Sequence, residues 1–183
     1  MTKQSTPMYI LRLALTLLLI TAAVAAALAG VNAITAPIIE TINYEKTQAA
    51  IQAVLPGGGQ PLDTYTDETG LVQAVYVSDT GYAIQVAPSG FDGEITMMVG
   101  IDKEGKVIAI DIISHTETPG LGAVSDADNA KGQAFRDQFA GLSGTLAVTK
   151  DGGTIDAITS ATITSRAVTA GINAALECAK NLG

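Results

Sequence analysis

The sequence has 183 residues, a formal net charge of -8 and a mean hydropathy of +0.34. Its apolar content of 48% excludes a disordered chain, and its single cysteine, Cys178, excludes a disulfide scaffold. Since nucleic-acid binding requires a basic face, a pI of about 4.4 argues against a nucleic-acid partner. An acidic chain with a positive mean hydropathy must gather its apolar residues in one segment.

That segment lies near the N-terminus, where no charged side chain occurs between Arg12 and Glu40. Residues 13–37 are predicted to form a single transmembrane helix, because they are long and apolar enough to cross a hydrocarbon core of about 30 Å. Basic residues precede the segment and acidic residues follow it, so the positive-inside rule predicts that residues 1–12 are cytoplasmic. The rest of the chain is then expected on the extracytoplasmic side of the cytoplasmic membrane.

A cleaved signal peptide is the alternative, since the small residues from Ala27 to Gly30 could form a cleavage site. The apolar run is too long for a signal peptide and continues past Gly30 to Ile34, which favours an uncleaved anchor. Two of the 10 Lys and Arg residues precede the anchor, and all 18 Asp and Glu residues follow it. The exported part therefore has eight basic residues against 18 acidic ones, a net charge of -10.

Turn residues divide the chain after the anchor into short elements. Pro37 is expected to end or kink the anchor helix, and an amphipathic connecting helix and linker are predicted over residues 38–60. The compact domain is expected over residues 61–183. Its predicted elements are strands at 71–78, 82–87, 94–101, 106–114, 144–149 and 154–158, and helices at 126–139 and 165–181. This order predicts an α+β domain of antiparallel strands with flanking helices.

Most catalytic and metal-binding patterns are missing from the sequence. The one histidine, His115, has no second His or Cys nearby to complete a zinc site, and Cys178 falls within the predicted closing helix as a small apolar residue. No Gly-x-Gly-x-x-Gly follows a predicted strand, which excludes a Rossmann nucleotide site. Residues 126–129 lack the glycine and glutamate of a calcium loop and fit an acidic helix start better.

Two segments carry an unusual mixture of residues. The loop 115–122 combines His, Glu and Thr with Pro119 and two glycines, which let the backbone approach a ligand closely. The segment 156–165 has five hydroxyl side chains directly before the closing helix. One hydroxyl is enough to cap a helix, so two interpretations remain: an N-cap with spare hydroxyls, or an anion site with a phosphate at the helix N-terminus.

The segment from Asp156 to Ser165 resembles the S/T-G-A-T flavinylation motif of the FMN-binding domain family. The loop 115–122 resembles a second block of that family, and Gly81-Tyr82, residues 90–93 and residues 135–139 are similar to further family features. The family includes the G subunit of the Rnf ion-translocating ferredoxin:NAD oxidoreductase and the C subunit of the sodium-pumping NADH:quinone oxidoreductase. The short chain favours the first of these.

The resemblance implies an FMN joined through its phosphate to the hydroxyl of Thr162. It also implies that Leu121 contacts the isoalloxazine ring. The remaining cofactor-binding residues that we expect are Glu117, Thr118, Gly120, Gly122, Thr159, Ser160, Ala161 and Arg166. No activating base lies near Thr162 in the sequence, so a separate flavin transferase is expected to attach the flavin.

The implied function is an electron relay in an ion-translocating complex whose partner subunits carry the NAD, iron–sulfur and ion-translocation steps. Three alternatives stay open: the equivalent subunit of the sodium-pumping NADH:quinone oxidoreductase, a stand-alone extracytoplasmic flavoreductase, and a regulatory or structural domain that has lost its flavin. His115 is expected to form a structural hydrogen bond rather than to exchange a proton with the flavin.

The sequence departs from the family pattern at Ser160, where the family usually has glycine. If that position has a positive φ, serine costs about 1 kcal/mol relative to glycine. The phosphate is expected to be held by the N–H groups at the helix start and by Arg166 rather than by the charge of the whole domain.

Overall fold

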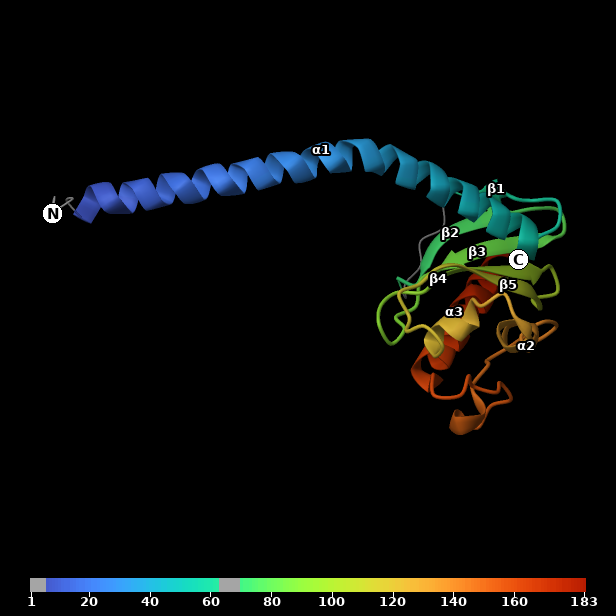
Figure 1. Ribbon diagram of the computed structural model, residues 1–183. Helices are drawn as coiled ribbons and strands as arrows, with labels where there is room; N and C mark the ends of the chain where they lie inside the picture. Colours follow the sequence, from blue (N-terminus) through green and yellow to red (C-terminus); the bar gives the residue numbers. More distant parts are fainter. Residues whose placement is uncertain (1–5, 63–69) are drawn as a thin grey trace. The chain divides into compact units, whose positions relative to one another are not determined.

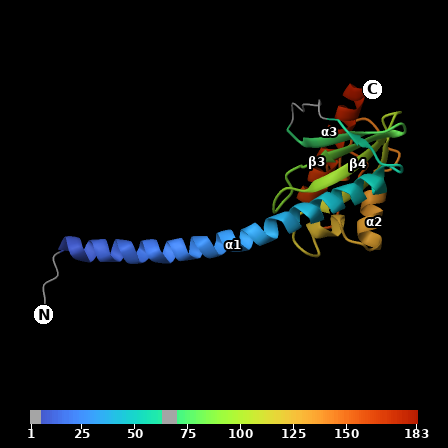
Figure 2. The same ribbon diagram turned by 90° about the horizontal axis from the view of Figure 1, so that it is seen from above.

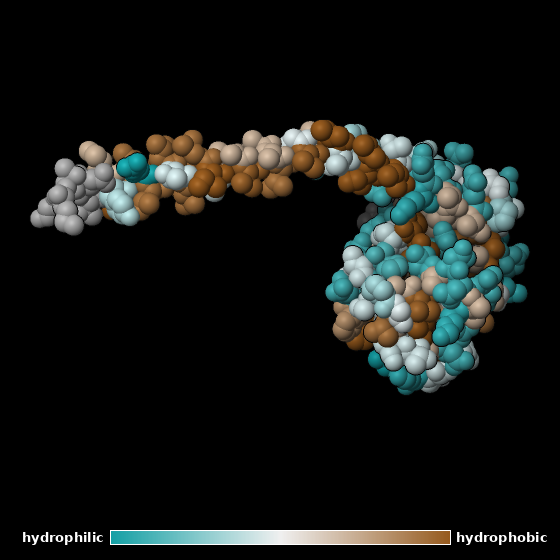
Figure 3. Space-filling view, in the orientation of Figure 1, coloured by the Kyte–Doolittle hydropathy of each residue, from teal (hydrophilic) through white to brown (hydrophobic). Residues whose placement is uncertain are grey.

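The computed structural model describes residues 6–62 and 70–183 and divides the chain into two compact units, Met1–Glu45 and Lys46–Gly183. The described part of the first unit lies in the long helix α1 (Thr6–Val54), on which apolar side chains form a nearly continuous surface (Figure 3). Among the described residues, α1 is the one helix that is long and apolar enough to cross a membrane. This finding fits a membrane anchor, because isolated apolar side chains need a lipid or protein environment.

Pro37 was expected to end or kink the anchor helix, and it does not end it, because α1 continues through Pro37 to Val54. Proline has a φ compatible with a helix, but it removes one N–H donor and crowds the carbonyl four residues earlier, so α1 continues through it at a cost of about 3 kcal/mol. The hydroxyl of Thr41 donates to the carbonyl of Pro37 at 2.9 Å. The predicted break after the connecting helix is confirmed, since Gly57 and Gly58 take positive φ values of 103° and 72° directly after α1.

The second unit is built on a five-stranded antiparallel meander in which the strands follow chain order (Figure 1). The predicted turns at residues 79–81 and 102–105 separate the second from the third strand and the fourth from the fifth. The strands are β1 (Gln60–Pro61), β2 (Val72–Val77), β3 (Gly81–Val86), β4 (Thr96–Asp102) and β5 (Val107–Ser114).

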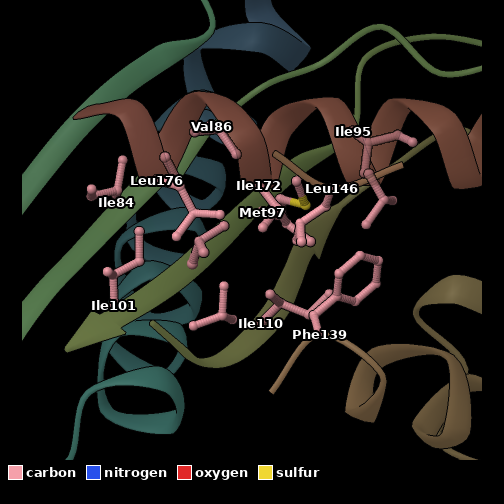
Figure 4. Packing of buried hydrophobic residues seen from close by; sticks show 14 of the residues in the cluster. Ile84, Val86, Ile95, Met97, Ile101, Ile110, Phe139, Leu146, Ile172 and Leu176 are labelled. Carbon is pink, nitrogen blue, oxygen red and sulfur yellow. The ribbon is translucent and has the colours of Figure 1, made fainter. Parts of the chain in front are cut away.

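The main core lies between one face of the sheet and the helix α3 (Thr162–Leu182), which crosses that face (Figures 1 and 2). Figure 4 shows Ile84, Met97 and Ile101 of the sheet packed against Ile172 and Leu176 of α3. The short helix α2 (Ala130–Asp137) adds Phe135, which meets Phe139 edge-on with ring centroids 5.5 Å apart. This core fixes the start of α3 relative to the sheet.

The opposite face of the sheet is covered by the end of α1. Ala50, Ile51 and Val54 pack with Met98 of β4 in a second apolar cluster. Gly100 of β4 allows this packing, because a Cβ at that position would collide with the carbonyl oxygen of Val54. Residues 46–55, expected as part of a connecting segment, therefore belong to the packed unit that carries the sheet.

The structure corrects four predicted elements. The helix expected over 126–139 is shorter: α2 covers Ala130–Asp137, and its N-cap Asn129 accepts hydrogen bonds from two backbone N–H groups. A 3-10 turn, η1 (Gly122–Ser125), precedes it in the loop after β5. Residues 144–149 and 154–158 do not form strands; they share one parallel bridge, between Val148 and Ile155, around the 3-10 turn η2 (Thr149–Asp151). The closing helix starts at Thr162, three residues earlier than predicted.

Candidate functional site

A surface cavity of about 270 Å³ lies between the loop after β5 and the start of α3. It brings together two segments that the sequence analysis selected separately. Seven of the ten predicted site residues line it, namely Glu117, Thr118, Leu121, Gly122, Ser160, Ala161 and Thr162, together with Phe91, Ile163 and Thr164. The cavity is close to the lower end of the usual volume of small-molecule pockets, roughly 300–1,000 Å³.

Glu117 is a buried carboxylate, 4% exposed, that connects three parts of the cavity wall. Its Oε1 accepts hydrogen bonds from the backbone N–H groups of Phe91 at 2.8 Å and Asp92 at 3.1 Å. Its Oε2 accepts a hydrogen bond from the hydroxyl of Thr164, in the first turn of α3. Gly90 and Gly122 flank the carboxylate, and a Cβ on either would collide with it.

The environment of Glu117 favours its ionised form. Burial raises the pKa of the carboxyl group. The hydrogen bonds from Thr164, Asp92 and Phe91 together lower the pKa by more than burial raises it, so the net pKa is below the ordinary 4.5. The carboxylate is therefore charged at neutral pH, and it acts as a bridge between the loop at residues 90–93 and the start of α3.

The start of α3 does not support the first interpretation of its hydroxyl-rich segment, an N-cap with spare hydroxyls. In the part of the chain that the structure describes, no side chain caps this helix, and its N-cap position is Ala161. The hydroxyls have other partners: Thr164 donates to Glu117, while Ser165 accepts from the N–H of Ile158 and donates to the carbonyl of Ala161. The N-terminal turn of α3 therefore has the positive dipole end and the N–H groups that an anion site uses.

Ser160 lies in a strained turn next to Thr162. Its φ is +64°, and it is the one residue other than glycine with a positive φ among those described. The N–H of Ala161 donates to the carbonyl of Ile158 at 2.9 Å, so Ser160 holds the turn position that normally selects glycine. The structure thus confirms the condition under which serine was expected to be unfavourable there.

Thr162 is half-buried, and its hydroxyl accepts a hydrogen bond from the ammonium group of Lys150 at 2.9 Å. Arg166 lies one helical turn later, but its guanidinium forms a bidentate ion pair with Asp151, at 2.7 Å and 2.6 Å. That pair raises the pKa of Arg166 and lowers the pKa of Asp151. The cation that contacts the Thr162 hydroxyl is therefore Lys150, which the sequence analysis did not select.

Apolar side chains surround the mouth of the cavity. Phe91, Leu121 and Ile163 are 67%, 42% and 49% exposed. Within residues 46–62 and 70–183, these are the large apolar side chains that remain exposed, and all three line the cavity. A group of exposed apolar side chains around a cavity is typical of a ligand or partner site.

The other predicted site residues lie beside the cavity rather than in it. Gly120 and Thr159 line a neighbouring groove, which shares Leu121 and Ser160 with the cavity. His115 accepts a hydrogen bond from the N–H of Glu117 through Nδ1 at 3.2 Å, and its Nε2 lies 3.7 Å from Asp126. This arrangement agrees with the structural hydrogen bond that was expected of His115.

Sequence reasoning missed three residues that shape the site: Lys150, Asp151 and Thr164. Thr164 was counted among the hydroxyls but given no partner, because Glu117 is 47 residues away in the sequence. Gln138 also braces the site, since its amide pairs with the N–H and carbonyl of Asp156 at 2.7 Å and 3.2 Å. The sequence feature that could have pointed to Lys150 is Gly152, which allows the tight turn that keeps residue 150 near the next helix.

Comparison with known proteins agrees with this geometry. Residues 90–177 match the family model of the FMN-binding domain. The chain is 34% identical to the G subunit of the Na⁺-translocating ferredoxin:NAD⁺ oxidoreductase complex of Acetobacterium woodii, over 94% of this chain and 93% of that protein. It is 33% identical to the G subunit of the ion-translocating oxidoreductase complex of Stutzerimonas stutzeri, over 90% of this chain and 78% of that protein.

A third relative is the G subunit of the proton-translocating ferredoxin:NAD⁺ oxidoreductase complex of Clostridium ljungdahlii, 43% identical over 52% of this chain and 51% of that protein. The three relatives share a subunit type; two of their names give different ions, Na⁺ and protons, and the third names no particular ion. Together with the FMN-binding domain and the cavity at the start of α3, this similarity identifies the chain as a member of the family of G subunits of ion-translocating oxidoreductase complexes.

Proposed function

We propose that this chain is the membrane-anchored electron carrier of an ion-translocating ferredoxin:NAD-type oxidoreductase complex, and that it carries FMN covalently through Thr162. One observation carries the proposal: the half-buried hydroxyl of Thr162 lies at the uncapped start of α3, beside a cation and at the edge of an apolar cavity. These are the features that a flavin phosphate and a flavin ring require.

The residues present fit the two parts of FMN. The N-terminal turn of α3 and the ammonium of Lys150 suit a phosphate on Thr162, since both favour negative charge. Phe91, Leu121 and Ile163 suit the apolar ring, because contact with a ring removes exposed apolar surface from water. When bound, FMN supplies the electron-accepting and electron-donating chemistry.

The contribution of this chain is to hold and shield the cofactor. Glu117 ties the Phe91 loop to α3, so the two walls of the cavity keep their spacing. Its negative charge borders the cavity and opposes the build-up of further negative charge there. We therefore assign Glu117 a positioning and electrostatic role and no part in proton transfer, since a carboxyl with a lowered pKa is a weak proton acceptor.

The exposed cavity mouth favours a relay over a complete catalyst. An electron carrier has to present its cofactor to a donor and an acceptor, and the apolar rim of this cavity remains accessible. The apolar run at residues 13–37 would hold the domain at the cytoplasmic membrane, with the N-terminus in the cytoplasm and residues 61–183 outside. Partner subunits would supply and remove the electrons, and a flavin transferase would attach the flavin after export.

Flavin fluorescence in a denaturing gel tests this proposal. The full chain is co-expressed with a flavin transferase, purified in detergent and compared with Thr162→Val and with Thr159→Val. We expect fluorescent bands for the wild type and for Thr159→Val, and no fluorescence for Thr162→Val. A dark wild-type band would contradict covalent attachment, and a fluorescent Thr162→Val band would contradict the assigned residue.

A further inference from the structure

Lys150 is the side chain whose charge the proposed function has not fully explained. It is exposed, it lies in the turn η2, and its ammonium donates to the hydroxyl of Thr162 at 2.9 Å. An exposed lysine loses side-chain entropy when it is held in one place, so a surface contact of this kind is of little use to the stability of the fold. The Lys150 ammonium contacts the Thr162 hydroxyl, which is the group to which the proposed function assigns the flavin.

The local structure keeps Lys150 in place. Gly152 has a φ of +84° and closes η2, and a Cβ on Gly153 would collide with the carbonyl oxygen of Ala147. The bridge between Val148 and Ile155 completes this tight turn. The turn thus faces α3 through residues 150 and 151, which contact Thr162 and Arg166 on one side of that helix.

The ion pair between Asp151 and Arg166 decides where the Lys150 ammonium binds. Asp151 follows Lys150 directly and would compete with Thr162 for its ammonium. Arg166 occupies both carboxylate oxygens of Asp151 through Nε and Nη2. The two cations and one carboxylate leave a net charge of +1 beside Thr162, within a domain whose net charge is strongly negative.

We propose that Lys150 is a positioning residue for flavin attachment: it orients the Thr162 hydroxyl and neutralises the phosphate that is joined to it, while Arg166 acts indirectly by occupying Asp151. The inference rests on the proposed attachment at Thr162. It revises the expectation that Arg166 itself holds the phosphate.

The attachment step shows where the charge of Lys150 acts. A bond forms between Thr162 Oγ1 and the phosphorus of a flavin phosphoanhydride, which is the donor that a separate transferase binds. One P–O bond of the anhydride breaks, and its electron pair leaves with the departing phosphate. The hydroxyl proton passes to the transferase or to water, since the ammonium of Lys150 donates to Thr162 Oγ1 and has no lone pair to accept it. The ammonium stabilises the negative charge on the phosphoryl oxygens and remains beside the phosphodiester.

The experiment measures the initial rate of flavin incorporation by intact mass, with the full chain in detergent, purified transferase and flavin adenine dinucleotide as the phosphoanhydride. Lys150→Met is expected to lower kcat for the acceptor protein by about tenfold, the usual scale of one charge-assisted hydrogen bond, with little change in KM. Lys150→Arg is expected to recover most of the rate. Lys103→Met, in the β4–β5 turn, is the control for loss of a lysine elsewhere.

A pair of variants separates the indirect role of Arg166 from direct contact. Arg166→Gln is expected to slow incorporation, because Asp151 then draws Lys150 away from Thr162. The double variant Asp151→Asn with Arg166→Gln is expected to restore the rate, whereas it would stay slow if Arg166 held the phosphate itself.

Three results would overturn the inference. These are a wild-type rate in Lys150→Met, an effect confined to KM, which would mean docking of the transferase, and no recovery in the double variant. Wild-type chain that takes up no flavin at all, under conditions where a known acceptor does, would instead refute the proposed attachment. Because these side chains are exposed, the variants should keep the wild-type unfolding midpoint, which serves as the folding control.

Discussion

The change Glu117→Gln tests whether the carboxylate holds the cavity together. Glutamine has nearly the same shape, and its carbonyl oxygen can still accept from the N–H groups of Phe91 and Asp92. Its amide group replaces the oxygen that accepts from Thr164, so the Thr164 hydroxyl has to rotate and accept instead. The substitution therefore keeps the volume and removes the charge.

The size of the effect follows from three hydrogen bonds and one buried charge. A hydrogen bond to a charged group contributes roughly 1.5–3 kcal/mol and a neutral one roughly 0.5–1.5, so about 1 kcal/mol is lost for each of the three. Removing a charge from a buried position also removes its desolvation cost, which offsets part of this lost stability. We expect Glu117→Gln to lower the free energy of unfolding by about 1–2 kcal/mol at pH 7.

Glu117→Ala should cost more than Glu117→Gln, about 3–5 kcal/mol, because it leaves the N–H groups of Phe91 and Asp92 without their acceptor and removes a buried side chain. The pH dependence gives an independent check. Since the pKa of Glu117 in the folded protein is lowered, its contribution is complete above the ordinary value of 4.5 and is lost as the pH falls through the folded-state pKa. Glu117→Gln lacks this loss, so the difference between wild type and variant should shrink below pH 4.5.

Thermal unfolding of the full chain in detergent, followed by circular dichroism from pH 3 to pH 8, measures both effects. The bridging role of Glu117 is refuted if Glu117→Gln unfolds at the wild-type temperature at pH 7, or if Glu117→Ala is no less stable than Glu117→Gln. A variant deficit that stays constant across the pH range would refute the role given to the charge.

Three further changes test particular features of the fold. Ser160→Gly should raise the free energy of unfolding by about 0.5–1 kcal/mol, because relief of the strain at the positive φ of 64° outweighs the greater freedom of glycine in the unfolded chain. A denaturation curve that shows a less stable variant would mean that the Ser160 side chain makes a stabilising contact. Gly100→Ala should lower the free energy of unfolding by about 1–3 kcal/mol, because the new Cβ collides with the carbonyl of Val54. Gly30→Ala, whose Cβ meets no neighbour, is the matched control. Equal melting temperatures of the two variants would contradict this packing. Asp126→Asn should stabilise the protein more at pH 8 than at pH 3.5, because burial raises the pKa of Asp126 and its ionised form also raises the pKa of Asp111; a stability gain independent of pH would contradict the assigned cause.

The sheet was predictable from the sequence because its information is local. Turn residues such as Asp79 to Gly81 and Asp102 to Gly105 mark hairpins, and Val- and Ile-rich runs lie between them. The strand β1 was missed because a pair of two residues has no periodicity to detect. The strands expected at 144–149 and 154–158 failed because the glycines at 152 and 153 turn the chain after a single bridge.

The candidate site was predictable in its parts but not in its connections. The loop at 115–122 and the segment at 156–165 were both selected from residue types, and the fold brings them to one cavity. The partners of Glu117 are 25 to 47 residues away in the sequence, so its role depends on the packing of α3 on the sheet. Arg166 was expected to hold the phosphate, and Lys150 was not selected, because it is 12 residues from Thr162 in the sequence. The contact of Lys150 with Thr162 and the pairing of Arg166 with Asp151 depend on the turn η2, which the sequence analysis did not predict.

Peptide mass mapping of the full chain tests the central claim most directly. The chain is purified after co-expression with a flavin transferase and digested, and the peptide that contains Thr162 is fragmented. We predict that this peptide gains the mass of FMN less one water, that fragmentation assigns the gain to Thr162, and that Thr162→Val abolishes it. An unmodified peptide from a preparation with active transferase, or a gain assigned to Thr159, Ser160 or Thr164, would contradict covalent attachment at Thr162.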